Sequence, residues 1–264
     1  RNSKQALMSK IQNIAFAIHN RIAYTTYMHG DEEMKNMLPE ERIDLGIRSV
    51  DEIDRIIRET GRFNKPGERI DFISKIFLNT PYIESTLIGS SAKREVFVVH
   101  FKGVDCFTFI DYVEPMRLSG SFGEFKENLK KIRYQNSIVE FGNRNHFFTD
   151  WIEFNGRNIH DVTALIGGSK TKKTKKMLNV NEDGTFLLQG VVSRGREIAY
   201  IPAHEIDASV VDAMNTGDYC GMYSEQPGLD VSHVGIIIKK DNDETLLRHA
   251  SSLEQYRQVV DQPI

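Results

Sequence analysis

Apolar positions recur every three or four residues through the first half of the chain, and this spacing predicts helices. Gly61 is expected to end the second of these helices and Pro81 to follow the third. Ser119 and Ser121 are the candidate caps of the fourth. The four predicted helical segments are residues 7–22, 49–61, 67–80 and 120–134.

Beyond residue 135 the pattern changes to short runs of branched and apolar residues, bounded by Gly, Pro, Asn or Asp. Such runs predict strands. A helix is expected to interrupt them at residues 205–217, where Gly217 would end it. The predicted strands are residues 186–192, 196–202, 232–240 and 245–251.

Helices that come first and antiparallel strands that come later favour an α+β fold over a doubly wound parallel sheet. The sequence predicts a helical N-terminal region at residues 1–62 and a main domain at residues 63–264. The lysine-rich run at residues 167–176 is expected to be a solvated, mobile loop. The alternative is that this run forms a basic rim that attracts a substrate bearing a carboxylate.

Composition narrows the function. The chain has 264 residues, a net charge of -3 and two cysteines. This charge gives no general argument for nucleic acid or for an anionic membrane, and two cysteines are too few for a disulfide framework. The apolar run at residues 14–18 is too short for a signal peptide or a membrane span. Because the chain begins with Arg1, it is expected to be a processed or trimmed form.

Cys106 begins an apolar, helix-like segment within "HFKGVDCFTFIDYVEPM". The preceding Asp105 is a candidate N-cap. A thiol at a helix N-terminus lies in a positive field, which favours the thiolate and so favours nucleophilic chemistry. The alternative is a small buried apolar side chain. The predicted inward face of the helix consists of Cys106, Phe109, Ile110 and Val113.

Among eight histidines, His233 and His249 lie in adjacent predicted strands joined by a turn-like link at residues 240–244. Pairing residue 239 with residue 243 would place the two histidines opposite each other on one face, with Cβ atoms about 5 Å apart. One imidazole could then orient the other. A slip of one residue would separate them, and two ordinary histidines on a half-buried face are the alternative. Gly235 could leave room for the Cys106 helix.

These segments resemble the NlpC/P60 superfamily of papain-like cell-wall peptidases, as seen in "GVDCFTFIDYV", "TGDYCGMYSEQPGLDVSHVGIIIK" and "LLRHASS". The resemblance implies that Cys106 is the nucleophile, His233 the base and His249 the orienting residue. Gly217 and Asp218 match the Gly-Asp that precedes the base strand in that family. The implied fold is a Cys-bearing helix packed on an antiparallel sheet.

A closer resemblance is to the N-acetylmuramoyl-L-alanine amidase-like branch, through "GERIDFISKIFLNTPYIESTL" and "RNHFFTDWI". It extends from about residue 67 to the C-terminus. The departure from the superfamily pattern is a long insertion between Cys106 and His233, which is expected to shape the substrate site.

Further residues are candidates for substrate binding. Tyr82 is similar to a superfamily tyrosine near the nucleophile that contacts substrate or oxyanion; the alternative is a tyrosine anchoring a turn. Arg144, His146, Asp150 and Trp151 could recognise a sugar and a peptide carboxylate, Trp151 by stacking and Arg144 by forked bonds. The alternative is a salt-bridged loop with an anchoring indole. Cys220 is expected to be a passive thiol.

The resemblance implies hydrolysis of the amide between N-acetylmuramic acid and L-alanine in peptidoglycan fragments, through an acyl-enzyme. No cofactor or metal is expected, because the His and Cys residues lack zinc-site spacing. No nucleic-acid partner is expected. A periplasmic or cell-envelope location follows, although this chain shows no export signal. A stem-peptide endopeptidase cutting after γ-D-glutamate, or a non-catalytic muropeptide-binding module, are the alternatives.

Overall fold

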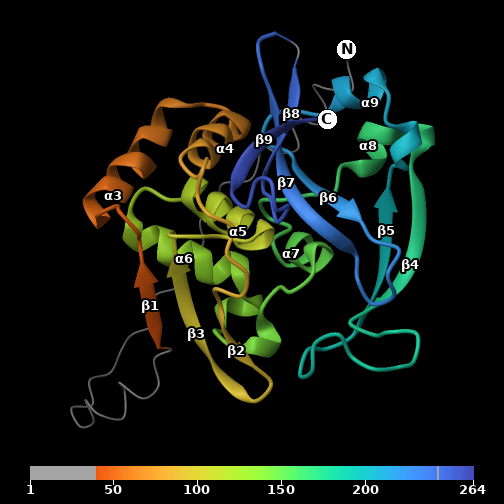
Figure 1. Cartoon of the computed structure of the whole chain (residues 1–264), viewed down its shortest axis with the longest axis horizontal. Coiled ribbons are helices and arrows are strands. Elements are labelled where there is room, and N and C mark those ends of the chain that lie inside the picture. Colours follow the sequence, from red (N-terminus) through yellow and green to blue (C-terminus); the bar gives the residue numbers. More distant parts are fainter. Residues whose placement is uncertain (1–39, 243) are drawn as a thin grey trace. The chain divides into compact units, whose positions relative to one another are not determined.

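The computed structural model describes residues 40–242 and 244–264. The predicted helix at residues 7–22 lies outside them. The described residues form a mixed α+β fold, as predicted (Figure 1). The helices are α3 (Val50–Glu59), α4 (Pro66–Lys75), α5 (Cys106–Arg117), α6 (Phe122–Arg133), α7 (Phe148–Phe154), α8 (Thr163–Gly167) and α9 (Ala208–Ala213).

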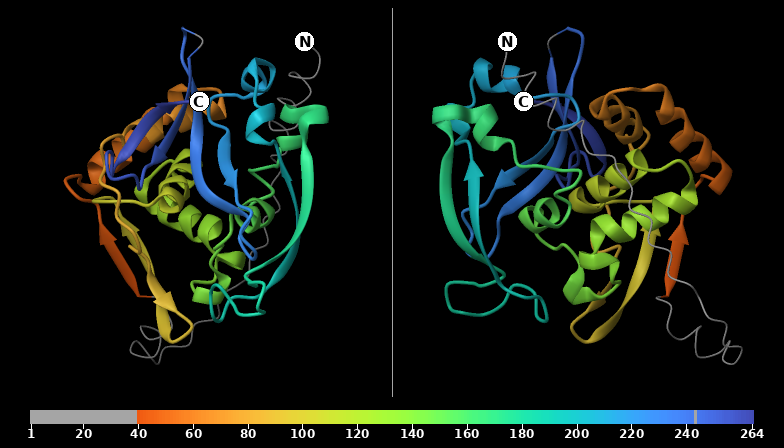
Figure 2. Two further views of the ribbon diagram at one scale, coloured as in Figure 1. Left: turned by 45° about the vertical axis from the view of Figure 1, so that its right-hand side comes forward. Right: turned by 180° about the vertical axis from the view of Figure 1, so that it is seen from behind.

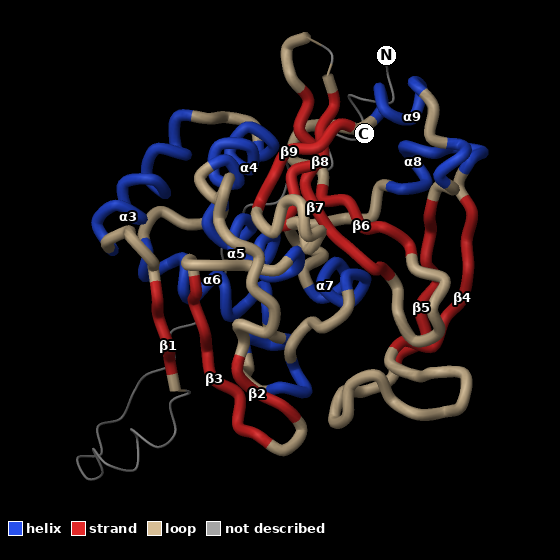
Figure 3. Tube along the Cα trace, in the orientation of Figure 1, coloured by secondary structure: helices blue, strands red, loops and turns tan. Residues whose placement is uncertain are grey.

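The strands of the described residues form three sheets (Figure 3). In the first, β3 lies between β1, which is parallel to it, and β2, which is antiparallel. The second is the antiparallel hairpin β4-β5, and the third is the antiparallel sheet β6-β7-β8-β9. The strands are β1 (Glu41–Asp44), β2 (Ile88–Ser90), β3 (Lys93–His100), β4 (Lys172–Leu178), β5 (Arg194–Tyr200), β6 (Tyr219–Tyr223), β7 (Val231–Lys239), β8 (Thr245–Ala250) and β9 (Val259–Pro263).

Local signals place the starts of the predicted helices. Ser49 caps α3 by accepting a bond from the Glu52 backbone N–H, and Ser121 caps α6 in the same way. These caps satisfy backbone N–H groups that have no partner inside the helix. The predicted helices at residues 49–61 and 120–134 are thus confirmed as α3 and α6. The third predicted helix is α4, which begins at Pro66 without a side-chain cap and ends at Lys75, earlier than predicted. Ser119 instead donates to the carbonyl of Pro115.

Helix α5 lies at the centre of the main apolar core, between the first sheet and the β6-β7-β8-β9 sheet (Figure 2). Phe109, Ile110 and Val113 of the predicted inward face are fully buried, but so are most other residues of α5, so the helix is buried on all sides and not on one face. Ile53 and Ile57 of α3 belong to the same core. Residues 40–62, placed by the sequence in the N-terminal region, thus pack with the rest of a single compact unit at residues 40–264.

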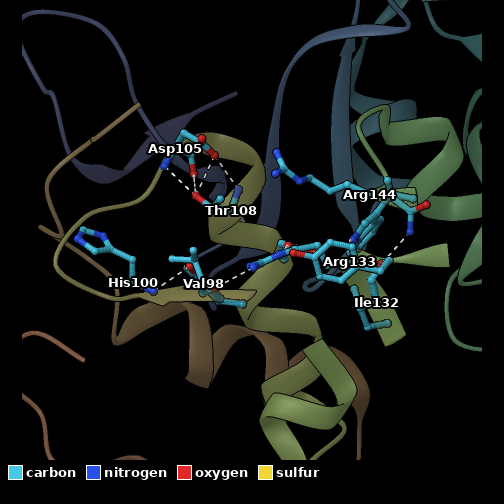
Figure 4. A network of polar contacts seen from close by, with 12 residues as sticks. Val98, His100, Asp105, Thr108, Ile132, Arg133 and Arg144 are labelled. Atoms are coloured by element: carbon cyan, nitrogen blue, oxygen red, sulfur yellow. Dashed lines mark hydrogen bonds and ion pairs between the residues drawn. The ribbon is translucent and has the colours of Figure 1, made fainter. Parts of the chain in front are cut away.

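Helix α5 also buries charge (Figure 4). Arg133 of α6 reaches Asp111 of α5 at 2.5 Å, and its Nη1 donates to the carbonyl of Val98 on β3 at 2.7 Å. The indole N–H of Trp151 points at the other oxygen of Asp111 at 3.3 Å. The ion pair therefore ties α5 to α6, α7 and β3 at once.

The lysine-rich run at residues 167–176 is not a mobile loop, because its second half belongs to β4, which pairs with β5 along its whole length. Lys173 bridges to Glu197 on β5 at 2.7 Å, and the carbonyls of Gln226 and Leu229 accept bonds from Lys176 Nζ. Leu178 is fully buried. Alternation along the strand lets the outward lysines stay solvated while the inward positions pack.

Two other predicted elements differ from the structure. Residues 186–192 form turns instead of a strand, and the Asn179 side chain bonds the carbonyls of Leu188 and Val191 there. The helix predicted at residues 205–217 shortens to α9, which Asp207 caps. Residues 186–192 are thus held by side-chain bonds that an apolar pattern does not reveal. No helix in the described part of the chain is long and apolar enough to cross a membrane.

Candidate active site

Cys106 is the first residue of α5. Asp105 and Thr108 form a reciprocal cap: the Thr108 backbone N–H donates to Asp105 Oδ1 at 2.7 Å, and the Asp105 backbone N–H donates to Thr108 Oγ1 at 2.9 Å. This cap, visible in Figure 4, confirms the predicted role of Asp105. It fixes the entry of the chain into the helix and so fixes the position of the half-buried thiol.

His233 of β7 and His249 of β8 lie in direct contact. His233 Nε2 and His249 Nδ1 are 2.6 Å apart, and the two rings are perpendicular with centroids 4.8 Å apart. The sequence therefore predicted the pairing of these two residues. A bulge in the pairing of β6 with β7 lies beside His233, a feature that re-aims side chains next to functional sites.

The predicted register of the hairpin is wrong by two residues. Lys239 pairs with Thr245, not with residue 243, because the link closes as a longer loop in which the Lys240 backbone N–H donates to the Glu244 carbonyl at 2.9 Å. Since the side-chain period of a strand is two, a two-residue shift keeps both histidines on the same face. They meet diagonally instead of directly.

Gly235 makes room for His249, a neighbour that the sequence pattern did not indicate. A Cβ at residue 235 would lie 3.0 Å from His249 Cβ, 3.0 Å from the Arg248 carbonyl oxygen and 2.8 Å from Leu247 Cδ1. Two of these atoms belong to backbone or to a Cβ and cannot swing aside. The absent side chain thus lets β8 bring His249 close to β7.

Gly235→Ala is therefore expected to lower the free energy of unfolding by about 1–3 kcal/mol through overpacking. Urea denaturation measures this directly. Gly61→Ala is the matched control, because a Cβ there would meet no atom within 4 Å. Equal stability of the two variants would contradict the close approach at Gly235.

The thiol of Cys106 lies against β7. The backbone N–H of Val234, the residue after His233, is close enough to the sulfur to lower its pKa, as are the backbone N–H groups of Cys106 and Phe107. Burial and the Asp105 carboxylate outweigh these groups and raise the pKa of the thiol to about 11. The expected depression of this pKa by the helix N-terminus is thus overridden by desolvation.

The pKa of His233 is shifted downward, in the opposite direction to that of Cys106. Burial, followed by the neighbouring His249, lowers the pKa of His233 to about 4. Burial also lowers the pKa of His249. At neutral pH the site therefore holds a protonated thiol beside two neutral imidazoles, so that His233 is free to accept a proton.

Alkylation of Cys106 by iodoacetamide is accordingly expected to be slow at pH 6, and to rise about tenfold per pH unit between pH 7 and pH 9 as the thiolate fraction grows. Peptide mapping by mass spectrometry separates Cys106 from Cys220. A rate already at its plateau at pH 6 would instead show a preformed thiolate. Because burial keeps the thiol protonated, slow alkylation near pH 6 is expected for an enzyme and for a binding module alike, and it does not distinguish the two.

Tyr82 is brought to this site. Its backbone pairs with Val104, two residues before Cys106, and its ring lies 4.9 Å from the Arg257 guanidinium. Burial, followed by the charges of Cys106 and Asp105, raises the pKa of Tyr82 to about 12. A protonated hydroxyl near the sulfur can donate to a substrate oxygen, so the predicted role of Tyr82 stays a prediction.

The other four predicted substrate-binding residues turn toward protein partners. Trp151 is fully buried, stacked on Phe148, and has no exposed face for a sugar. The Arg144 guanidinium forms a forked ion pair with the buried Glu95. Asp150 is bonded to Arg196 at 2.6 Å, and His146 Nε2 lies 2.8 Å from the Phe141 carbonyl oxygen. The ion pairs and the anchoring indole of the alternative are present, but Asp150 and Trp151 lie buried in α7 and not in a surface loop.

Two further sequence features have structural explanations. Gly217 has a φ of +91°, and a Cβ on it would lie 2.5 Å from Gly67 Cα at the start of α4, so the Gly-Asp pair allows a close approach of backbones. The Asp218 carboxylate accepts from the Asn215 backbone N–H. Cys220 lies opposite Gly235 on β6, and both cysteines are free thiols.

Gln262 of β9 also belongs to the site, although no sequence pattern predicted it. Its Oε1 lies 2.5 Å from His249 Nε2, the ring nitrogen that does not face His233. Only the pairing of β8 with β9 brings the two residues together, since Leu247 lies opposite Gln262 and His249 opposite Val260. No local pattern around residue 262 indicates the contact.

The fold and this cluster define a mixed α+β protein with a thiol at a helix start beside a pair of bonded imidazoles. A family model described as AmiA-like, N-acetylmuramoyl-L-alanine amidase-like, matches residues 72–264. The chain belongs to this family. None of the curated proteins matches the chain.

Solved structures are similar along most of the chain. An N-acetylmuramoyl-L-alanine amidase from Bacteroides uniformis is 27% identical, with a TM-score of 0.61, and covers 75% of this chain and 89% of its own. A Bacteroides fragilis protein named as a candidate xylanase is 28% identical, with a TM-score of 0.58, and covers 72% and 89%. A Legionella pneumophila protein shares the fold, with a TM-score of 0.65, 24% identity and coverage of 81% and 87%.

Proposed function

We propose that this protein is a cysteine amidase that hydrolyses the bond between the lactyl group of N-acetylmuramic acid and L-alanine in peptidoglycan fragments. The observation that carries the proposal is the 2.6 Å contact between His233 Nε2 and His249 Nδ1, with the Cys106 thiol against the same strand. Family membership supplies the substrate class.

The proposed chemistry begins with a proton transfer. His233 takes the thiol proton on Nδ1, the ring nitrogen that does not contact His249, while the sulfur attacks the lactyl carbonyl carbon. The raised pKa of the thiol and the lowered pKa of His233 mean that the proton moves during attack, and that no ion pair stands ready beforehand. His249 holds the ring of His233 in place.

The oxyanion that forms on the carbonyl oxygen is stabilised by backbone N–H groups at the start of α5, which already face the sulfur. His233 then gives its proton to the alanine nitrogen, the C–N bond breaks, and the stem peptide leaves first. The lactyl group remains as a thioester on Cys106. Water, deprotonated by His233, attacks this thioester and restores the thiol.

We also propose that α5 and the β6-β7-β8-β9 sheet correspond to the papain-like core of the NlpC/P60 superfamily. Support comes from their packing: Phe109 and Ile110 of α5 share one apolar core with Val234 and Ile236 of β7. Because peptidoglycan lies outside the cytoplasmic membrane, we propose a periplasmic or cell-envelope location.

Two other activities compete with this proposal. An endopeptidase acting after γ-D-glutamate would use the same thiol chemistry on a different bond, and a muropeptide-binding module would use none. The xylanase name of the Bacteroides fragilis neighbour has less support here, because glycoside hydrolysis typically uses two carboxyl groups flanking the bond and this cluster consists of a thiol and imidazoles.

Mass spectrometry of defined muropeptides after incubation with the protein tests the proposal. The expected products are a free stem peptide that begins with L-alanine and a glycan that ends in an intact lactyl carboxylate. A cut inside the stem peptide would establish the endopeptidase instead. Binding of the muropeptide without any product would favour the binding module.

A further inference from the structure

The two histidines and Gln262 form one continuous chain of hydrogen bonds. His233 Nε2 meets His249 Nδ1 at 2.6 Å, and His249 Nε2 meets Gln262 Oε1 at 2.5 Å. Three adjacent strands, β7, β8 and β9, supply one side chain each. His249, in the middle, is only 5% exposed, so its ring depends on these two partners for its hydrogen bonds.

The chemistry of each partner fixes where the protons lie. An amide oxygen can only accept, so His249 must carry its proton on Nε2. A neutral imidazole has one N–H, which leaves His249 Nδ1 as an acceptor and requires His233 to donate from Nε2. His233 Nδ1 is then left without a proton.

We infer that Gln262 is a positioning residue that sets the tautomer of both histidines and thereby makes His233 Nδ1 the atom that can accept a proton. The inference rests on the proposed function only for what that atom does, which is to take the proton of Cys106. The setting of the tautomers is a property of the folded protein itself.

The opposite chain of bonds shows why an acceptor at residue 262 matters. Two neutral rings that share one hydrogen bond have only two arrangements, and in the second His249 Nδ1 donates to His233 Nε2. His233 would then carry its proton on Nδ1 and could not act as a base toward the thiol. The observed contact of His249 Nε2 with the amide oxygen of Gln262 is a hydrogen bond only in the first arrangement, whereas the second would require the amide to turn and donate from its NH2 group.

The surroundings keep both rings neutral, which makes the tautomer the deciding property. Burial lowers the pKa of both histidines. The nearest carboxylate to act on His249 is that of Asp261, which raises this pKa but is bonded to Arg248 at 2.7 Å. The second imidazole lies next to His233, and the thiol, which burial holds protonated, lies against the backbone N–H of the next residue, Val234.

Gln262→Leu removes the acceptor and keeps a side chain of similar reach. The ¹⁵N chemical shifts of the imidazole nitrogens, measured by NMR in the full chain, report which nitrogen of each ring carries the proton. In the parent, both histidines are expected to be protonated on Nε2 and bare on Nδ1. In the variant this preference is expected to weaken or reverse.

Steady-state kinetics on a muropeptide provide the second readout. Gln262→Leu is expected to lower kcat by at least about tenfold and to leave KM unchanged, because the wrong tautomer affects the chemical step and not binding. Gln262→Met is a second variant in case the first does not fold, and thermal unfolding checks both. Gln258→Leu is the matched control, since Gln258 lies directly before β9 and its side chain bonds Asn79 instead of a histidine.

Each outcome decides a different point. Unchanged tautomers in both variants, or a rise in KM at constant kcat, would overturn the inference. A shift of tautomer in a protein that cleaves no muropeptide would uphold the role of Gln262 and reject the proposed function. Cleavage at parental kcat despite reversed tautomers would uphold the function and overturn the claim that the tautomer set by Gln262 makes His233 the base.

Discussion

Replacing Cys106 with alanine is expected to abolish hydrolysis of muropeptides, with a fall in kcat/KM of at least about 10⁴-fold. The reason is that no acyl-enzyme can form without the sulfur, whereas the imidazole pair and the surrounding fold are unaffected by loss of one half-buried atom. Mass spectrometry of the products against time measures the residual rate. Isothermal titration with the same muropeptide shows whether binding survives.

Cys220→Ala is the matched control for this variant. Cys220 is the only other cysteine of the chain, and it lies opposite Gly235 on β6 with its pKa raised to about 11 by burial. It is expected to keep parental activity within about twofold. Full activity of Cys106→Ala, or equal loss in both variants, would sink the assignment of the nucleophile.

The sequence predicted the parts of this site that local signals encode. Asp105, predicted as the N-cap, fixes the start of α5 together with Thr108, which lies only three residues further on. Alternation along β7 and β8 fixes the face of His233 and His249, even though the length of the turn and hence the register were wrong by two residues. A helix cap and the alternation of side chains along a strand each depend on a few adjacent residues, so both can be recognised in a single sequence.

The parts that failed depend on residues distant in the chain. The lysine-rich strand β4 exists because β5 pairs with it, and the Gln262 contact exists because β9 pairs with β8. Composition also does not show whether the side chains of a segment that mixes charged and aromatic residues point toward solvent or into the interior. Arg144 and Trp151 were expected to face a ligand, but each has a partner in the interior, Glu95 and Asp111 respectively.

The inward turn of Trp151 links the core to the site. Its indole N–H approaches the same carboxylate that pairs with Arg133, and that carboxylate belongs to the helix whose first residue is Cys106. The residues expected to hold substrate thus help to hold the nucleophile helix. The position of the thiol against β7 therefore depends both on this buried polar network and on the apolar packing of α5.

Asp111→Ala is therefore expected to lower the free energy of unfolding by about 3–5 kcal/mol, because it leaves the guanidinium of Arg133, a side chain only 2% exposed, buried without a counter-charge. Denaturation in urea, followed by circular dichroism, measures the change. Glu197→Ala is the matched control: its ion pair with Lys173 is exposed, with 48% and 60% of the two side chains accessible, and its loss is expected to cost less than about 1 kcal/mol.

A double variant separates the lost pair from the stranded charge. Asp111→Leu combined with Arg133→Met removes both charges and fills the space with apolar atoms, so its stability is expected to return to within about 2 kcal/mol of the parent. A loss as large in the double variant as in Asp111→Ala would mean that the ion pair is itself required for the packing of α5. A loss below about 1 kcal/mol in Asp111→Ala would show that Arg133 finds another partner or reaches water, and that the network does not hold the nucleophile helix.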